Sequence, residues 1–223
     1  MTLGLTVTGR LQLYINPAQT WFACAMAILL LVGAVASFAI RPGEEHHDHG
    51  HEHAAPSRVG LVATIAGGVV ASGVAVAALV FPPATLSAEL AMERDTGTPP
   101  LFAGADEVEL GVVDTSAFGI GDWSATFATA TSPERYAGEQ VRLTGFVMPG
   151  DDGSVELSRL VITHCVIDAQ AASLPVAAGV PDGLATGDWV ELTGDVVVDD
   201  SGALTIEASS IEPVDEPEDP YEY

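Results

Sequence analysis

The sequence predicts a membrane α-helical hairpin followed by a C-terminal all-β domain that folds as a small OB-like Greek-key barrel. Two observations predict the hairpin: residues 21–40 carry no charged side chain, and a second apolar run follows at residues 59–82. The β domain is predicted by short runs of alternating apolar and polar residues, separated by turn sequences, over residues 138–213.

The charge of the chain is concentrated in its C-terminal part. All 7 basic residues are arginine, against 31 acids, and the formal net charge is −24. Of these acids, 27 lie in residues 89–223, beside only four arginines. A negative field of this size repels phosphate backbones, so we expect no nucleic-acid partner. Codon bias or salt adaptation is also a sufficient explanation for the missing lysine.

Residues 1–20 are predicted to be an interfacial N-terminal segment. They are mildly apolar but are interrupted at Arg10 and Pro17, so they are too short to cross a membrane. Tyr14 and Trp21 are residue types that favour the membrane–water interface.

Residues 21–40 are predicted to be a transmembrane helix. Twenty residues in a helix extend about 30 Å, which matches the hydrocarbon core of a bilayer. A cleavable signal peptide is the alternative, and the second apolar run argues against it. Cys24 lies in this run and Cys165 in the acidic part, so we expect no disulfide between them.

Residues 59–82 are predicted to be the second transmembrane helix. Small residues recur there at every fourth position, at Gly60, Thr64, Gly68 and Ser72. Such a face lets another helix approach closely in lipid, although the general abundance of glycine and alanine in this chain also accounts for it.

The loop between the two helices, residues 41–58, is flanked by Arg41 and Arg58. Arginine close to the helix ends favours a cytoplasmic loop. We therefore expect a multi-pass protein of the cell membrane with an extracytoplasmic C-terminal domain.

The remaining chain divides into three parts. Residues 83–127 are predicted to be a juxtamembrane linker and extended region, and residues 128–214 a barrel of about five strands. A change in apolar parity within the second strand predicts a bulge at Ser158 and Arg159. Residues 215–223 read as a solvated acidic tail.

Several stretches together resemble one bacterial family. They are residues 136–147, residues 159–169 around the His164-Cys165 pair, residues 187–194, the closing Pro-Tyr-Glu-Tyr at 220–223, and Tyr-Ile-Asn-Pro at 14–17. In this combination they resemble the two-component permease subunits called YcgQ-like. The resemblance implies an N-terminal membrane region, a C-terminal β domain and, as partner, a large multi-spanning permease encoded nearby.

The chain departs from the family pattern at two places. Members begin with a full helix before the Tyr14 segment, where only thirteen residues stand here. Members also tend to carry Cys-Cys where this chain has His164-Cys165. That exchange keeps a metal-binding group but removes a vicinal dithiol.

The loop between the apolar runs is rich in metal-binding groups. It contains five histidines, His46, His47, His49, His51 and His53, interspersed with four carboxylates. Imidazole and carboxylate suit Zn²⁺ or another divalent metal, but no rigid spacing such as HExxH occurs. A solvated polar loop is the alternative.

His164, Cys165 and Asp168 form a second candidate metal site. If the strand continued through them, His164 and Cys165 would point to opposite faces, which weakens a shared site unless the strand ends there. A buried structural thiol is the alternative. Nucleophilic catalysis needs a histidine beside the thiol and a third orienting group, so we predict no enzyme.

These observations lead to two functional hypotheses. The first is a membrane-anchored accessory subunit of a permease complex with an acidic extracytoplasmic β domain. The second is a stand-alone membrane metal-binding or metal-sensing protein that uses the His-rich loop.

Overall fold

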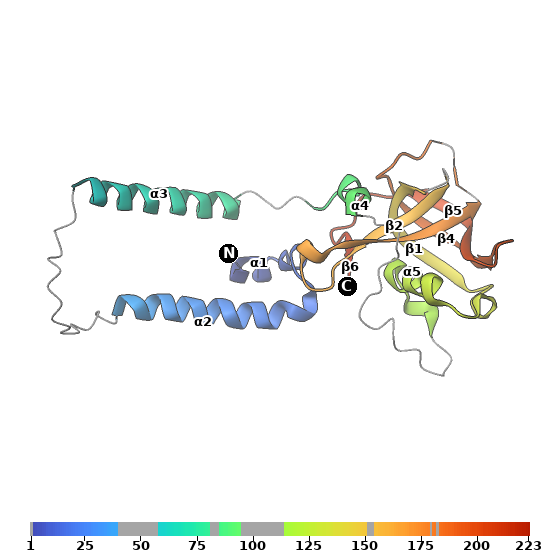
Figure 1. Cartoon of the computed structure of the whole chain (residues 1–223), viewed down its shortest axis with the longest axis horizontal. Helices are drawn as coiled ribbons and strands as arrows, with labels where there is room; N and C mark the ends of the chain where they lie inside the picture. The colour runs from blue at the N-terminus through green and yellow to red at the C-terminus, as the bar shows by residue number, and fades with distance from the viewer. Residues whose placement is uncertain are drawn as a thin grey trace. The chain divides into compact units, whose positions relative to one another are not determined.

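The computed structural model divides the chain into two compact units (Figure 1). One unit comprises Met1–Gly9 and Trp21–Ala84, and the other comprises Arg10–Thr20 and Thr85–Tyr223. The structure describes residues 2–39, 58–80, 85–94, 114–150, 154–178, 180–181 and 183–223. The predicted His-rich loop, residues 41–58, lies outside the described residues except for Arg58 at its end.

The first unit is helical, with α1 (Thr2–Val7), α2 (Thr20–Ala39) and α3 (Arg58–Val80). Within the described part of the chain, Pro17–Ala36 is the one helical stretch long and apolar enough to cross a membrane. Its length and composition fit a membrane anchor or a signal sequence. Helix α3 has 23 residues, and the stretch Ile65–Val74 within it is apolar. The structure does not show α2 and α3 packed as a hairpin, so the hairpin stays a prediction.

The second unit contains a closed five-stranded barrel that fits an OB-like fold, as predicted. Its strands are β1 (Gln140–Pro149), β2 (Val155–Val161), β3 (Gln170–Ala178), β4 (Trp189–Val198) and β5 (Leu204–Pro213). They are ordered β1-β4-β5-β3-β2, and β1 also pairs with β2 to close the barrel. The β3–β5 pair is parallel and the other barrel pairs are antiparallel.

The predicted bulge at Ser158 and Arg159 is wrong. The β2–β3 register runs without a shift from Val155 opposite Val176 to Val161 opposite Gln170. The apolar parity changes because β2 is buried on both of its faces. Leu157 and Val161 belong to the barrel core, whereas Leu160 and Ile162 belong to a second apolar cluster outside it.

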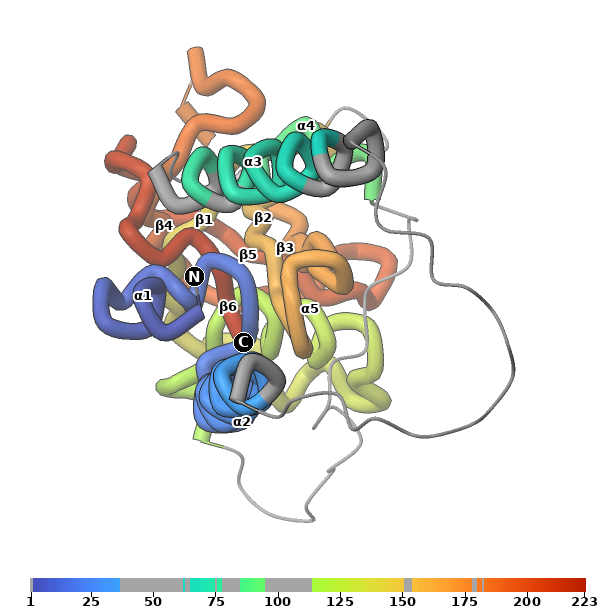
Figure 2. The backbone as a smooth tube through the Cα atoms, turned by 90° about the vertical axis from the view of Figure 1, so that its left-hand side faces the viewer, coloured from blue at the N-terminus to red at the C-terminus, as the bar shows by residue number. Residues whose placement is uncertain are grey.

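Helix α5 (Ile120–Thr129) packs against β1, β2 and β3, opposite α4 (Ala88–Arg94) on the barrel (Figure 1 and Figure 2). It inserts Ile120 and Trp123 into the barrel core, where each is at most 1% exposed. Trp123 makes edge-to-face contacts with the rings of three aromatic neighbours, Phe118, Phe127 and Tyr136. The prediction of an extended region over residues 83–127 missed this helix, which has only ten residues.

The second apolar cluster covers the outer face of β1, β2 and β3. Side chains from Phe146, Met148 and Leu160 pack there with Ala91 of α4 and with Tyr221. Tyr221 belongs to β6 (Tyr221–Glu222), which pairs in parallel with β2. The prediction that residues 215–223 are solvated is therefore wrong at their end, because the Tyr221 ring is 4% exposed. The face that OB folds often use for ligands is here covered by the chain itself.

Candidate functional site

The candidate site is the β2–β3 connection, residues 162–169, which we call the His-Cys loop. Strand β2 ends at Val161, and the loop forms a short 3₁₀ turn at Val166–Asp168 before β3 begins. The strand therefore stops before His164, so strand alternation does not separate His164 from Cys165.

Asp168 closes this loop on itself. Its carboxylate accepts the backbone N–H of His164 at 3.0 Å and that of Cys165 at 3.2 Å. It also lies 3.1 Å from Nδ1 of His164. Burial opposes ionisation of Asp168, but the two N–H groups and the imidazole outweigh it, so the pKa of this carboxyl is lowered.

The His164 ring projects outward, with 71% of its side chain exposed. The tautomer that bonds to Asp168 carries its proton on Nδ1 and leaves Nε2 as the ring's acceptor. The Cys165 thiol is half-buried and free, and among the described hydrogen bonds none joins it to His164. The pair does not present an activated thiolate–imidazole arrangement of the kind that nucleophilic catalysis needs.

Of the predicted metal ligands, the structure brings His164 and Asp168 together. Nowhere in the ranges that the structure describes do three His, Cys, Asp or Glu groups gather to hold a metal. Both Asp168 oxygens already accept N–H groups, which reduces their value as ligands. A metal at this trio stays a prediction, and the five histidines at 46, 47, 49, 51 and 53 lie outside the described residues.

The segment just before α2 is hydrogen-bonded to the His-Cys loop. Ile15 and Cys165 form an antiparallel bridge, in which Asn16 N–H donates to the His164 carbonyl at 3.0 Å. Val166 N–H donates to the Tyr14 carbonyl at 2.9 Å. The 14–16 segment therefore adds a short strand-like edge to the loop.

The Asn16 side chain fixes this edge in place. Its Nδ2 donates to the carbonyls of Ile162 at 3.2 Å and Thr163 at 3.1 Å. Its Oδ1 accepts Ala18 N–H at 2.9 Å and so caps the 3₁₀ turn Pro17–Gln19, which leads directly into α2. One asparagine thus links the barrel loop to the start of the apolar helix.

The segment after α3 reaches the same loop. Arg94, in the last turn of α4, donates to the carbonyls of Val166 and Ala169, both at 3.0 Å. Leu86 N–H, just before α4, donates to the Tyr221 hydroxyl at 2.8 Å. Both acceptors are backbone carbonyls of the loop, so this contact does not depend on the loop's side chains.

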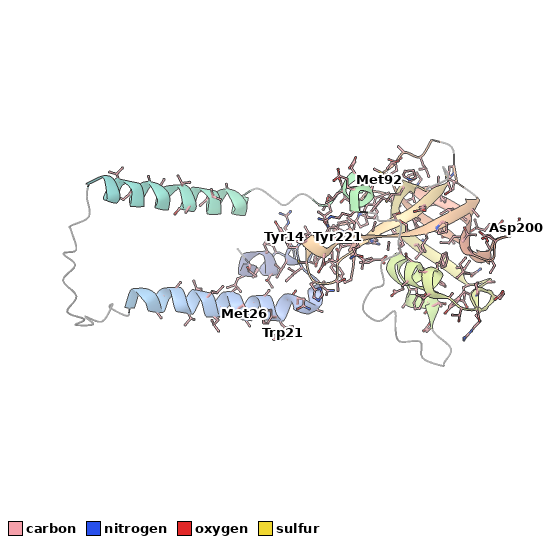
Figure 3. All side chains as sticks on the ribbon, in the orientation of Figure 1. Tyr14, Trp21, Met26, Met92, Asp200 and Tyr221 are labelled. Atoms are coloured by element: carbon pink, nitrogen blue, oxygen red, sulfur yellow. The ribbon has the colours of Figure 1, made fainter. Side chains whose placement is uncertain are left out.

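The C-terminus completes the site, and Figure 3 shows Tyr14 and Tyr221 at the same end of the barrel, away from Asp200. The Glu222 carboxylate accepts the N–H groups of Ile120 at 3.0 Å and Gly121 at 2.7 Å, at the start of α5. The Tyr223 hydroxyl lies 3.1 Å from the Gln12 carbonyl.

Hydrogen bonds of Arg159 and Tyr223 hold the C-terminal residues against the barrel. The Arg159 guanidinium donates to the Thr144, Asp219 and Pro220 carbonyls and stacks 5.8 Å from the centre of the Trp189 ring. Burial, and then the nearby Asp219 carboxylate, raise the pKa of Tyr223, so its hydroxyl stays protonated.

A small hollow of about 170 Å³ lies where Asn16, the His-Cys loop, the start of α5 and the C-terminal residues meet. It is lined in part by Asn16, Thr163, Glu222 and Tyr223. At its wall the Asn16 amide and the Glu222 carboxylate already bond to backbone groups.

Reasoning from residue types missed the residues that build this site. Asn16, Arg94 and Glu222 act by bonding backbone groups far away in sequence, which no local spacing reveals. The available signals were Asn before Pro at 16–17, which favours a cap, and the resemblance at residues 14–17 and 220–223.

Comparison with known families matches both parts of the chain. The DUF1980 N-terminal domain matches residues 1–97, and the DUF1980 C-terminal domain matches residues 124–223. The chain belongs to the DUF1980 family. In DUF1980 terms, the His-Cys loop belongs to the C-terminal domain and is held by two segments of the N-terminal domain, residues 10–20 and 85–94.

Two other comparisons add little to the DUF1980 match. Curated proteins give no match. Among solved structures, "OBody AM1L10 bound to hen egg-white lysozyme" is similar over 48% of this chain and 99% of that one, at 18% identity. Its TM-score is 0.28, which is too low to support an argument about this chain.

Proposed function

We propose that this DUF1980 protein is a membrane-anchored accessory subunit of a permease complex, with its acidic β domain outside the cytoplasm. The observation that carries the proposal is the double attachment of the His-Cys loop. The segment leading into α2 and the segment following α3 both bond to this one loop. Because the segments that lead to α2 and from α3 both bond to the domain, a movement of these helices would be passed on to it. Such coupling suits a subunit that works beside a larger partner.

The side chains of the apolar helices support membrane anchoring. Leu29, Leu30 and Val32 of α2 are each more than 60% exposed in the isolated chain, so lipid or a partner helix must cover them. On α3, Gly68 has no heavy atom within 4 Å of its Cβ position. In the proposal α3 is a second span, and Arg41 and Arg58 keep the loop between the spans in the cytoplasm.

The β domain supports a structural role over a ligand-binding one. The outer face of β1, β2 and β3 is buried under α4 and β6. The domain's net negative charge disfavours nucleic acids and anionic lipids as ligands. These features favour contact with a protein partner or with the surface of the membrane that anchors the domain.

Co-purification with the multi-spanning permease that the family resemblance implies as the partner tests this proposal. Wild-type protein solubilised in mild detergent is expected to elute with the permease. Gly68→Leu, which adds bulk to the small-residue face, should weaken the complex, whereas Val69→Leu on an adjacent face serves as the matched control. A protein that is monodisperse alone, with both variants and the wild type ignoring the permease, refutes the subunit proposal.

A second candidate function, metal binding, is favoured by one observation at His164. Its Nδ1 is tied to Asp168, which is how metal-ligating histidines are commonly oriented, and its ring is exposed. Together with the five histidines of the inter-helix loop, this supports a Zn²⁺-binding role. Loss of function on replacing those five histidines by alanine, with the permease complex intact, would favour this second candidate.

A further inference from the structure

We propose that the His-Cys loop lies in the interfacial layer of the membrane, with Ile167 immersed at the boundary between headgroups and acyl chains. This inference rests on the membrane anchoring proposed above and names one further surface, a lipid-facing edge of the β domain. It makes the loop a contact with the bilayer that carries α2, and not with a separate macromolecule.

The first argument is the length of the chain between the loop and the apolar helix. Asn16 is bonded to three loop carbonyls, and Trp21 begins the uncharged run. Between them lie a 3₁₀ turn and the first residues of α2, a rise of about 9 Å at 2.0 Å and 1.5 Å per residue. The polar layer on each side of a bilayer is about 5–8 Å thick. A loop tied to Asn16 therefore cannot lie far from the headgroups.

The second argument is the second attachment. Arg94 bonds to Val166 and Ala169, on either side of Ile167. It belongs to α4, which begins eight residues after α3 ends. The loop is therefore tied along the chain to both apolar helices, through Asn16 before α2 and through Arg94 after α3.

The third argument is the character of the loop's exposed face. Ile167 is 84% exposed, the most exposed large apolar side chain described in the barrel unit. The loop's own acid, Asp168, has its charge compensated by two N–H groups and the His164 ring, so little unpaired negative charge faces outward. Trp21, 72% exposed at the start of α2, is a residue type that favours the same layer.

An environment-sensitive fluorophore attached at single cysteines tests the inference. The background is the full chain with Cys24→Ser and Cys165→Ala, reconstituted in phosphatidylcholine vesicles without the permease. Labels are placed by Ile167→Cys, by Val32→Cys in α2, and by Asp200→Cys in the β4–β5 turn at the opposite end of the barrel (Figure 3). Nitroxide-labelled lipids quench labels in the bilayer, and iodide quenches labels in water.

We expect the Val32 label to be quenched by nitroxides deep in the acyl region, and the Ile167 label by nitroxides near the headgroups. The Asp200 label should be quenched by iodide and keep an aqueous emission maximum. If Val32 reports lipid while Ile167 behaves like Asp200, the interfacial loop is refuted and the anchor stands. If Val32 itself reports water, anchoring fails, and this inference fails with it.

Discussion

The contact of Glu222 with α5 yields the sharpest prediction about stability. The carboxylate accepts Ile120 N–H at 3.0 Å and Gly121 N–H at 2.7 Å, two donors that the first turn of a helix leaves without intrahelical partners. Its negative charge also faces the positive end of the helix dipole. Truncation by Glu222→Ala removes both acceptors from a helix whose Ile120 and Trp123 are buried in the core.

The magnitude follows from the geometry. Hydrogen bonds to a charged group contribute about 1.5–3 kcal/mol each, and partial exposure of the Glu222 side chain lets water recover some of that. We therefore expect Glu222→Ala to lower the free energy of unfolding by about 2–4 kcal/mol. Glu222→Gln, which keeps one acceptor oxygen and loses the charge, should cost about half as much.

Urea unfolding of the full chain in mild detergent measures this change. Tryptophan fluorescence follows Trp123 and Trp189 in a Trp21→Phe background, so the signal reports the barrel. The matched control is Glu218→Gln, which removes one acidic charge at an exposed position of the same tail. Equal urea midpoints for Glu222→Gln and Glu218→Gln would refute the assigned role of the carboxylate.

Three further predictions concern the His-Cys loop and the inter-helix loop. Asn16→Ala should destabilise the barrel by about 1–3 kcal/mol in the same urea assay, because it leaves the partly buried Ile162 and Thr163 carbonyls short of a donor, while Gln19→Ala serves as control. The pKa of Asp168 is lowered on folding, so its stabilisation is present above roughly pH 4, the unfolded value, and is lost as the pH falls through the folded value. Asp168→Asn should remove that acid-dependent part, and unchanged curves would contradict it. A peptide of residues 41–58 should take up Zn²⁺ at neutral pH and lose affinity below about pH 6.5, because imidazole binds metal when neutral; calorimetry with no uptake at neutral pH refutes this.

The barrel was predictable from sequence because its information is local. Strands β1 and β4 can be predicted from their alternating apolar residues, and the β4–β5 turn from the sequence Asp199 to Gly202. Each of these predictions needs only a short stretch of sequence. The parity rule failed at β2, where Leu160 and Ile162 are covered by parts of the chain that the rule does not consider. Alternation predicts one buried face, and it reads a strand buried on both faces as an irregularity.

The candidate site was only half predictable for a related reason. Side-chain chemistry predicted His164, Cys165 and Asp168 as a site, and Asp168 does bond to His164. The groups that hold the loop in place are instead an asparagine, an arginine and backbone amides supplied from 70 or more residues away. Such contacts follow from how the folded chain brings distant segments together. Neither β6 nor the 14–16 segment has the apolar periodicity that would predict its pairing with the barrel. The four acids before Tyr221 predicted a solvated tail, whereas the Tyr221 ring is buried.

The contacts at the His-Cys loop bring together stretches that lie far apart in the chain. Residues 14–17, 159–169 and 220–223 meet at this loop, and most of their bonds run to backbone groups. At this meeting point the carboxylates of Asp168 and Glu222 accept backbone N–H groups. In this chain, Asn16 and Arg94 therefore bond the segments that flank the apolar helices in sequence to the His-Cys loop. Arg94→Ala should therefore lower the urea midpoint of the barrel, because it leaves the Val166 and Ala169 carbonyls without this donor.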